Sequence, residues 1–138
     1  MIFQQTIQTF SQSPRKLFAI DGFGALLSAF LLGIVLVKLE STFGIPRSAL
    51  YVLAFIPCLF AVYDGYCYWN VKNNISPFLK GIAIANVLYC LLSIGFAIYH
   101  HQSLTVLGWA YILVEIVIVL LLANIEMKVA DGKFTKHG

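Results

Sequence analysis

Charged side chains are scarce in this sequence. Only 11% of its 138 residues are Asp, Glu, Lys or Arg, whereas 60% are hydrophobic. Soluble domains carry roughly 25% charged residues, so this composition excludes an ordinary soluble domain. The hydrophobic residues lie in four long runs, and a helix needs about 20 apolar residues to cross a bilayer. We therefore predict an integral membrane protein with a single domain, residues 1–138, and no separate soluble module.

The sequence also lacks the short motifs of several common chemistries. It has no Gly-rich phosphate loop, no nucleophile elbow and no H-E-x-x-H zinc motif. Cys58, Cys67 and Cys90 form no C-x-x-C pair and lie inside apolar runs, which is typical of buried, unpaired cysteine. The adjacent His100 and His101 point to different helix faces, so they do not predict a metal site. We expect no catalytic residue, no metal and no cofactor, and hence no enzyme.

The basic residues form no stripe of the kind that binds nucleic acid, so we expect no nucleic-acid partner. Instead they gather on one side of the predicted membrane segments. Only Lys38 and Arg47 fall on the side opposite the termini. The side that holds both termini and the second loop carries Arg15, Lys16, Lys72, Lys80, Lys128, Lys133 and Lys136. By the positive-inside rule, we predict that the N- and C-termini are cytoplasmic.

The four hydrophobic runs predict transmembrane helices at residues 17–39, 47–71, 78–99 and 104–127. The connections between them are short, which forces neighbouring helices to run antiparallel. The predicted fold class is therefore an all-α membrane protein, an up-down bundle of four transmembrane helices. Residues 2–12 place apolar side chains on one helical side, so they form either an interfacial helix or a frayed tail.

Proline and serine mark the expected helix starts. Ser13-Pro14 and Ser76-Pro77 each supply an N-cap residue followed by a first helical residue. Pro57 falls inside the second predicted helix and is expected to kink it.

Each predicted span carries one strongly polar side chain. A charged group inside the membrane is costly unless it is paired, and it tends to mark a functional site. At a rise of 1.5 Å per residue, Asp21 lies roughly 6 Å from the cytoplasmic end, and Asp64 and Asn86 lie roughly 11 to 13 Å from it. Glu115 lies roughly 18 Å in, near the midplane. We expect the polar faces to meet inside the bundle and to open toward the cytoplasm. The candidate ion- or solute-binding residues are Glu115, Asp64, Asn86, Asp21, Tyr89 and Tyr111.

Small residues accompany these polar positions. A face of small residues lets two helices pack closely in a membrane. On the first span such a face recurs every four residues, at Asp21, Ala25, Ala29 and Gly33.

Three of the polar residues also have a structural interpretation, which stays open. Asp21 lies close enough to the helix start to face the helix dipole, or to pair with Arg15 or Lys16. Asn86 could join two helices through hydrogen bonds. Glu115 is the hardest to explain in this way, because no basic residue lies at its depth, although a role as hydrogen-bonded glue is its alternative.

Lysine side chains offer a structural interpretation for the carboxyl groups nearer the cytoplasm. A long Lys side chain can extend along apolar surface and bring its ammonium group to a carboxylate. Asp64 could pair in this way with Lys72 or Lys80. Glu126 shares the helical face of Glu115, but it lies two residues before Lys128, and we expect it at the membrane interface.

Two stretches carry a family resemblance. Residues 20–25 (IDGFGA) and 84–90 (IANVLYC) resemble those of small bacterial four-helix integral membrane proteins with no assigned activity. The resemblance extends from about residue 17 to residue 128. It implies the four-helix fold and the bacterial inner (plasma) membrane, and it implies no substrate. The architecture is also similar to that of small multidrug carriers, which have an essential membrane glutamate. Here the glutamate lies on the fourth helix rather than the first, so we transfer none of their residues.

Two functions are compatible with this sequence. The first is an ion- or proton-coupled carrier or channel for a small solute, with Glu115 as the responsive group and Asp64 and Asn86 as neighbours. A water-accessible pocket would favour it. The second is a non-catalytic accessory or assembly subunit whose polar residues hold helices together, which a dry, fully hydrogen-bonded interior would favour. Besides the lipid bilayer, a homodimer and an unidentified membrane partner both stay open as assemblies.

Overall fold

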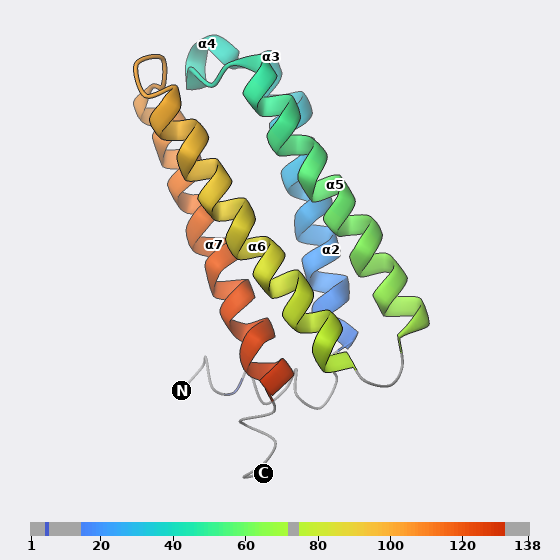
Figure 1. Ribbon diagram of the computed structural model, residues 1–138. Coiled ribbons are helices and arrows are strands. Elements are labelled where there is room, and N and C mark those ends of the chain that lie inside the picture. The colour runs from blue at the N-terminus through green and yellow to red at the C-terminus, as the bar shows by residue number, and fades with distance from the viewer. Residues whose placement is uncertain (1–4, 6–14, 72–74, 132–138) are drawn as a thin grey trace.

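The computed structural model describes residue 5 and residues 15–71 and 75–131. Its long helices lie side by side as an antiparallel bundle (Figure 1). Four of them are long and apolar enough to cross a membrane, and no strand occurs among the described residues. The predicted fold class, an all-α bundle of four transmembrane helices, is therefore confirmed. In chain order the elements are α2 (Arg15–Phe30), η1 (Leu31–Val35), α3 (Leu36–Lys38), α4 (Glu40–Phe43), α5 (Arg47–Asn70), α6 (Ile75–Tyr99) and α7 (Val106–Asp131).

The helix ends differ from the predicted ones by up to four residues. Ser76 does not cap α6, because that helix already begins at Ile75. Its hydroxyl instead donates to the carbonyl oxygen of Ala130 in α7, at 2.5 Å. The contact holds the start of α6 against the end of α7, which continues to Asp131. The predicted interfacial segment 2–12 and the Ser13-Pro14 cap lie outside the described residues, apart from Gln5.

The bundle consists of two closely packed helix pairs. α2 packs chiefly against α5, and α6 packs chiefly against α7 (Figure 1). Glycine makes the first contact close: a Cβ atom added at Gly33 would lie 3.2 Å from Cβ of Ala54, and one at Gly22 would lie 3.3 Å from Cβ of Asp64. The backbones of α2 and α7 scarcely approach each other. This uneven packing leaves room for a cavity between α2 and α7.

At one end of the bundle, the connection after α3 is bound to the connection between α6 and α7. The backbone N–H of Thr105 donates to the Phe43 carbonyl at 3.2 Å, and its hydroxyl donates to the Thr42 carbonyl at 2.6 Å. The Ser103 hydroxyl donates to the Gly44 carbonyl at 2.8 Å. Gly44 has a φ of +74°, a left-handed conformation that glycine adopts without strain. These contacts join the two helix pairs at this end.

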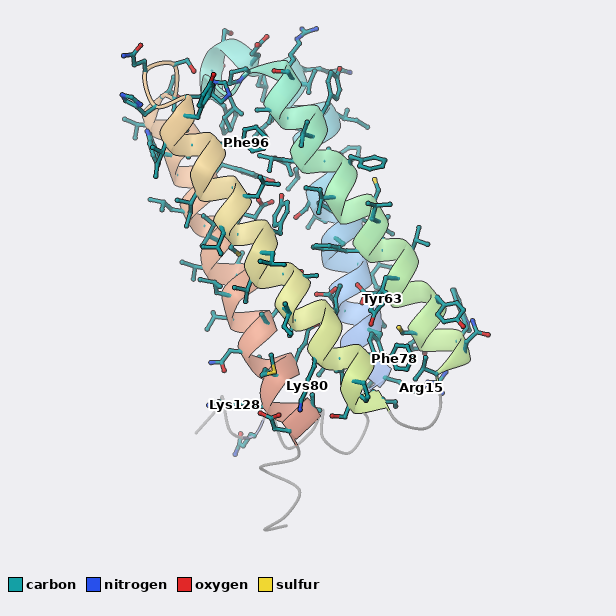
Figure 2. All side chains as sticks on the ribbon, viewed as in Figure 1. Arg15, Tyr63, Phe78, Lys80, Phe96 and Lys128 are labelled. Atoms are coloured by element: carbon teal, nitrogen blue, oxygen red, sulfur yellow. The ribbon has the colours of Figure 1, made fainter. Side chains whose placement is uncertain are left out.

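The opposite end is held by side chains that bind backbone carbonyls. The Arg15 guanidinium donates to the Tyr68 carbonyl and lies 5.0 Å from the centre of the Tyr68 ring. The Tyr63 hydroxyl donates to the Phe78 carbonyl at 2.9 Å, which ties α5 to α6. Figure 2 shows Arg15, Tyr63 and Phe78 together at this end.

The outer surface and the core are both largely apolar. Large apolar side chains on all four spans are more than half exposed, for example Phe23, Phe55, Leu88 and Val114, as suits contact with lipid. Inside, the buried apolar residues form two clusters. Along each of the four long helices, one buried polar side chain falls between the two clusters, namely Asp21, Asp64, Asn86 and Glu126.

Candidate functional site

A group of polar side chains joins all four transmembrane helices. We call Asp21 of α2, Asp64 of α5, Asn86 of α6 and Glu126 of α7 the acid cluster. The amide nitrogen of Asn86 donates to Asp21 Oδ1 at 2.9 Å and to Glu126 Oε1 at 3.2 Å. Every member is at most 4% exposed. A single amide thus connects two buried carboxyl groups from different helices.

The carboxyl groups of the acid cluster also contact one another. Those of Asp64 and Glu126 each lie within hydrogen-bonding reach of Asp21. A carboxylate oxygen only accepts, so a hydrogen bond between two carboxyl groups requires a proton on one of them. Asp21 Oδ2, Glu126 Oε2 and both Asp64 oxygens find no donor among the described residues. A proton shared between two of these carboxyl groups would supply a donor that the described side chains do not provide.

The expected lysine and arginine partners of these carboxyl groups lie elsewhere. Lys80 pairs with Asp131 at 3.2 Å, and Arg15 binds the Tyr68 carbonyl. The proposed Asp21–Arg15 and Asp64–Lys80 pairs are therefore wrong. The physical reason is that α7 extends to Asp131. Lys80 pairs with this partly exposed carboxylate and so need not be buried to reach Asp64. Lys72 lies outside the described residues.

The expectation that Glu126 lies at the membrane interface is also wrong. Its side chain is fully buried and bound to Asn86. The end of α7 lies four residues beyond the predicted one, which places Glu126 a full turn deeper. The spacing predicts the correct helical face, because Glu126 follows Glu115 by roughly three helical turns.

Glu115 forms a second polar group, and both of its carboxyl oxygens accept hydrogen bonds. The hydroxyls of Ser28 and Tyr111 donate to Oε2 at 3.1 and 3.0 Å, and the Tyr89 hydroxyl donates to Oε1 at 3.1 Å. We call these four residues the Glu115 group. Sequence reasoning named both tyrosines and did not assign Ser28 to the site. The six candidate residues therefore fall into two groups rather than one.

A cavity of about 240 Å³ between α2 and α7 reaches both groups. Apolar side chains form most of its wall, including Pro57 and Phe60 of α5. Its polar lining residues are Asp21, Ser28, Asn86, Tyr89, Tyr111 and Glu115. Five of the six candidate residues therefore line one cavity, whereas Asp64 contacts it only through Asp21.

Among the described residues, the predicted opening toward the cytoplasm is not part of this cavity. The cavity does not extend to the end that holds Arg15 and Asp131. Buried Leu17, Phe18 and Leu79 lie between the acid cluster and that end. A second pocket, of about 360 Å³, is lined by Asp64 together with Phe18 and Tyr68, so it reaches the acid cluster from the side of α2 and α5.

Comparisons with known proteins give no relative from which a function could be inferred. No protein-family model, no characterised protein and no solved structure matches the chain. Within residues 15–71 and 75–131, no group of three or more His, Cys, Asp or Glu side chains is arranged to hold a metal ion. What remains is a membrane bundle with buried carboxyl groups and a partly polar cavity.

Proposed function

We propose that this small membrane protein is a proton-coupled carrier of a small solute. In this proposal the acid cluster holds the proton, and the cavity between α2 and α7 holds the solute. One observation supports it above the others. Asp21 lines the cavity, is 3% exposed and has an oxygen, Oδ2, without a donor among the described residues. A group in this position can respond both to a proton and to a solute.

Electrostatic repulsion supports the proton-binding role. Two negative charges about 4 Å apart repel by roughly 4 kcal/mol at an effective dielectric constant of 20. Three carboxylates in contact would add several such terms, besides the cost of burying charge in a membrane. A proton between Asp21 and Asp64 or Glu126 removes one charge and supplies the missing donor. Protons thus stabilise the cluster as it stands, and their loss favours a rearrangement.

We place the protein in the inner membrane of a bacterial cell. The single end of the bundle that holds both Arg15 and Asp131 then faces the cytoplasm. α2 begins and α7 ends on the same side of the bundle (Figure 1). Arg15, Lys16 and Lys80 lie toward this side, and the positive-inside rule favours its cytoplasmic location.

One observation favours the alternative, an accessory subunit whose polar residues only hold helices together. Glu115 already has three hydroxyl donors, and these come from three different helices. Hydrogen bonds of this kind join membrane helices. The acid cluster does not fit this alternative equally well, because four of its six carboxyl oxygens have no donor among the described residues.

Proton uptake into sealed proteoliposomes tests the proposal. Under an imposed pH gradient, a pH-sensitive dye inside the vesicles should report faster uptake with the wild-type protein than with empty vesicles. We expect Asp64→Asn and Glu126→Gln each to reduce the protein-dependent rate at least tenfold. The matched control is Glu40→Gln, because Glu40 pairs with Arg47 at 3.2 Å on the exposed opposite end.

The outcomes separate the two functions. A wild-type rate equal to that of empty vesicles would overturn the proton-coupled carrier. Equal rates in wild type and in both cluster variants would show that protons do not pass through the acid cluster. Circular dichroism of each variant confirms that a lost rate is not lost folding.

A further inference from the structure

We propose that the solute is a lipophilic amine of about one ring in size. Its ammonium group binds at Glu115, and the molecule reaches the cavity sideways from the bilayer, between α2 and α7. This inference rests on the proposed function, and it names the solute class and the route of access.

The size of the cavity limits the size of the solute. A buried apolar cavity of roughly 150 Å³ takes up benzene. At about 240 Å³, the cavity between α2 and α7 has room for one ring and a short chain. Apolar residues such as Leu31, Phe60 and Val119 form the wall, so the body of the solute is apolar. A sugar or an amino acid would leave its polar groups without partners there.

The charges around the cavity select a cation. Asp21 and Glu115 both line it, and no Lys, Arg or His does among the residues described. Glu115 is 8% exposed, so it is within reach of a molecule in the cavity. An ammonium group can replace the Ser28 or Tyr111 hydroxyl as a donor to Glu115 Oε2, at the same atom and with an added charge. A carboxylate-bearing solute would instead be repelled.

The position of the opening indicates access from lipid. Gly24 on α2 lies on the cavity wall and is exposed, and a Cβ atom added to it would meet nothing within 4 Å. Leu27 of α2 is 59% exposed and Ile118 of α7 is 60% exposed, and both line the same cavity. The gap between these two helices therefore faces the hydrocarbon region. A lipophilic molecule dissolved in the bilayer can pass through it without crossing a charged surface.

Equilibrium dialysis against the protein in nanodiscs tests this inference. The probe is 2-phenylethylamine, and 2-phenylethanol and phenylacetate supply neutral and anionic molecules of nearly the same shape. Empty nanodiscs correct for partitioning into lipid. We expect saturable binding of the amine, at least tenfold tighter than that of the alcohol, and no saturable binding of phenylacetate.

Two glycine variants test the route of access. Gly24→Leu places a side chain in the proposed opening, and we expect at least a tenfold loss of amine affinity. Gly95→Leu is the matched control, because Gly95 on α6 is also exposed and its added Cβ would also meet nothing within 4 Å. Gly95 does not line the cavity, so its variant should bind as the wild type does. Glu115→Gln should lose the preference for amine over alcohol.

Each failure has a distinct meaning. Equal affinity for amine and alcohol, or unchanged amine binding in both Gly24→Leu and Glu115→Gln, overturns the inference. If proton uptake depends on Asp64 but the protein binds no amine, the proposed solute class is overturned and the proton-coupled carrier stands. Amine binding without any proton uptake overturns the proton-coupled carrier and leaves the binding site.

Discussion

Replacing Asn86 with Leu should destabilise the bundle, because Asn86 holds two carboxyl groups on different helices. Leu has the same branched side-chain skeleton as Asn and is somewhat larger, so the change mainly removes the donors to Asp21 Oδ1 and Glu126 Oε1. Hydrogen bonds between membrane helices contribute about 0.6 kcal/mol on average and up to about 1.7 kcal/mol. Two such bonds to acids therefore predict a loss of about 1 to 3 kcal/mol in the free energy of unfolding. Denaturation of the protein in mixed micelles, followed by circular dichroism, measures this loss.

The control for this prediction is Ser93→Ala on the same helix. The Ser93 hydroxyl is buried, and it lies within hydrogen-bonding reach of the Tyr89 hydroxyl one turn earlier on α6. Its removal should change the free energy of unfolding by less than Asn86→Leu does, because the contact that is lost lies within α6 and joins no second helix. If Asn86→Leu were as stable as wild type, Asn86 would not be joining the helices. The acid cluster would then have a different arrangement in the membrane.

Two further changes test the packing of the bundle. Gly33→Leu should lower the free energy of unfolding by about 1 to 3 kcal/mol, because the added side chain overpacks against Ala54. The first added atom would lie 3.2 Å from Cβ of Ala54. Thermal unfolding in detergent, with Gly95→Ala as the control, measures this cost. Gly44→Ala should lower the free energy of unfolding by at least about 1 kcal/mol, because φ is +74° and the added Cβ would overlap the Ser103 carbonyl. The Thr105 amide, which donates to the Phe43 carbonyl beside Gly44, should then exchange its hydrogen faster. An unchanged exchange rate at Thr105 would contradict the prediction.

The sequence allowed prediction of the helices, because membrane spans depend on long apolar runs that are visible without tertiary information. The exact helix ends were harder to predict, because contacts between helices determine them. α7 extends to Asp131 because Val129 is buried and the Ala130 carbonyl accepts a bond from Ser76. The π-helical turn η1 (Leu31–Val35) lies within a uniformly apolar run and has no local signal in the sequence.

The candidate site was predicted in composition but not in arrangement. Depth and helical face placed Asp21, Asp64, Asn86 and Glu115 inside the bundle, where all four are buried. Their division into two groups depends on how far each helix is shifted along its neighbours, which periodicity does not report. Glu126 was placed on the correct helical face but at the membrane interface, because its depth follows from the end of α7.

Helix α2 connects the two polar groups, since Asp21 belongs to the acid cluster and Ser28 binds Glu115. The two residues are separated by seven positions, or roughly 10 Å along the helix. At that distance and an effective dielectric constant of 20, two unit charges interact by roughly 1.7 kcal/mol, which corresponds to a factor of about 17 in an equilibrium constant. In the proposed carrier, a cation bound at Glu115 therefore favours release of a proton from the acid cluster, and a proton bound there weakens cation binding by the same factor. Coupling of this size makes cation binding and proton binding mutually unfavourable, and it requires no contact between the two groups.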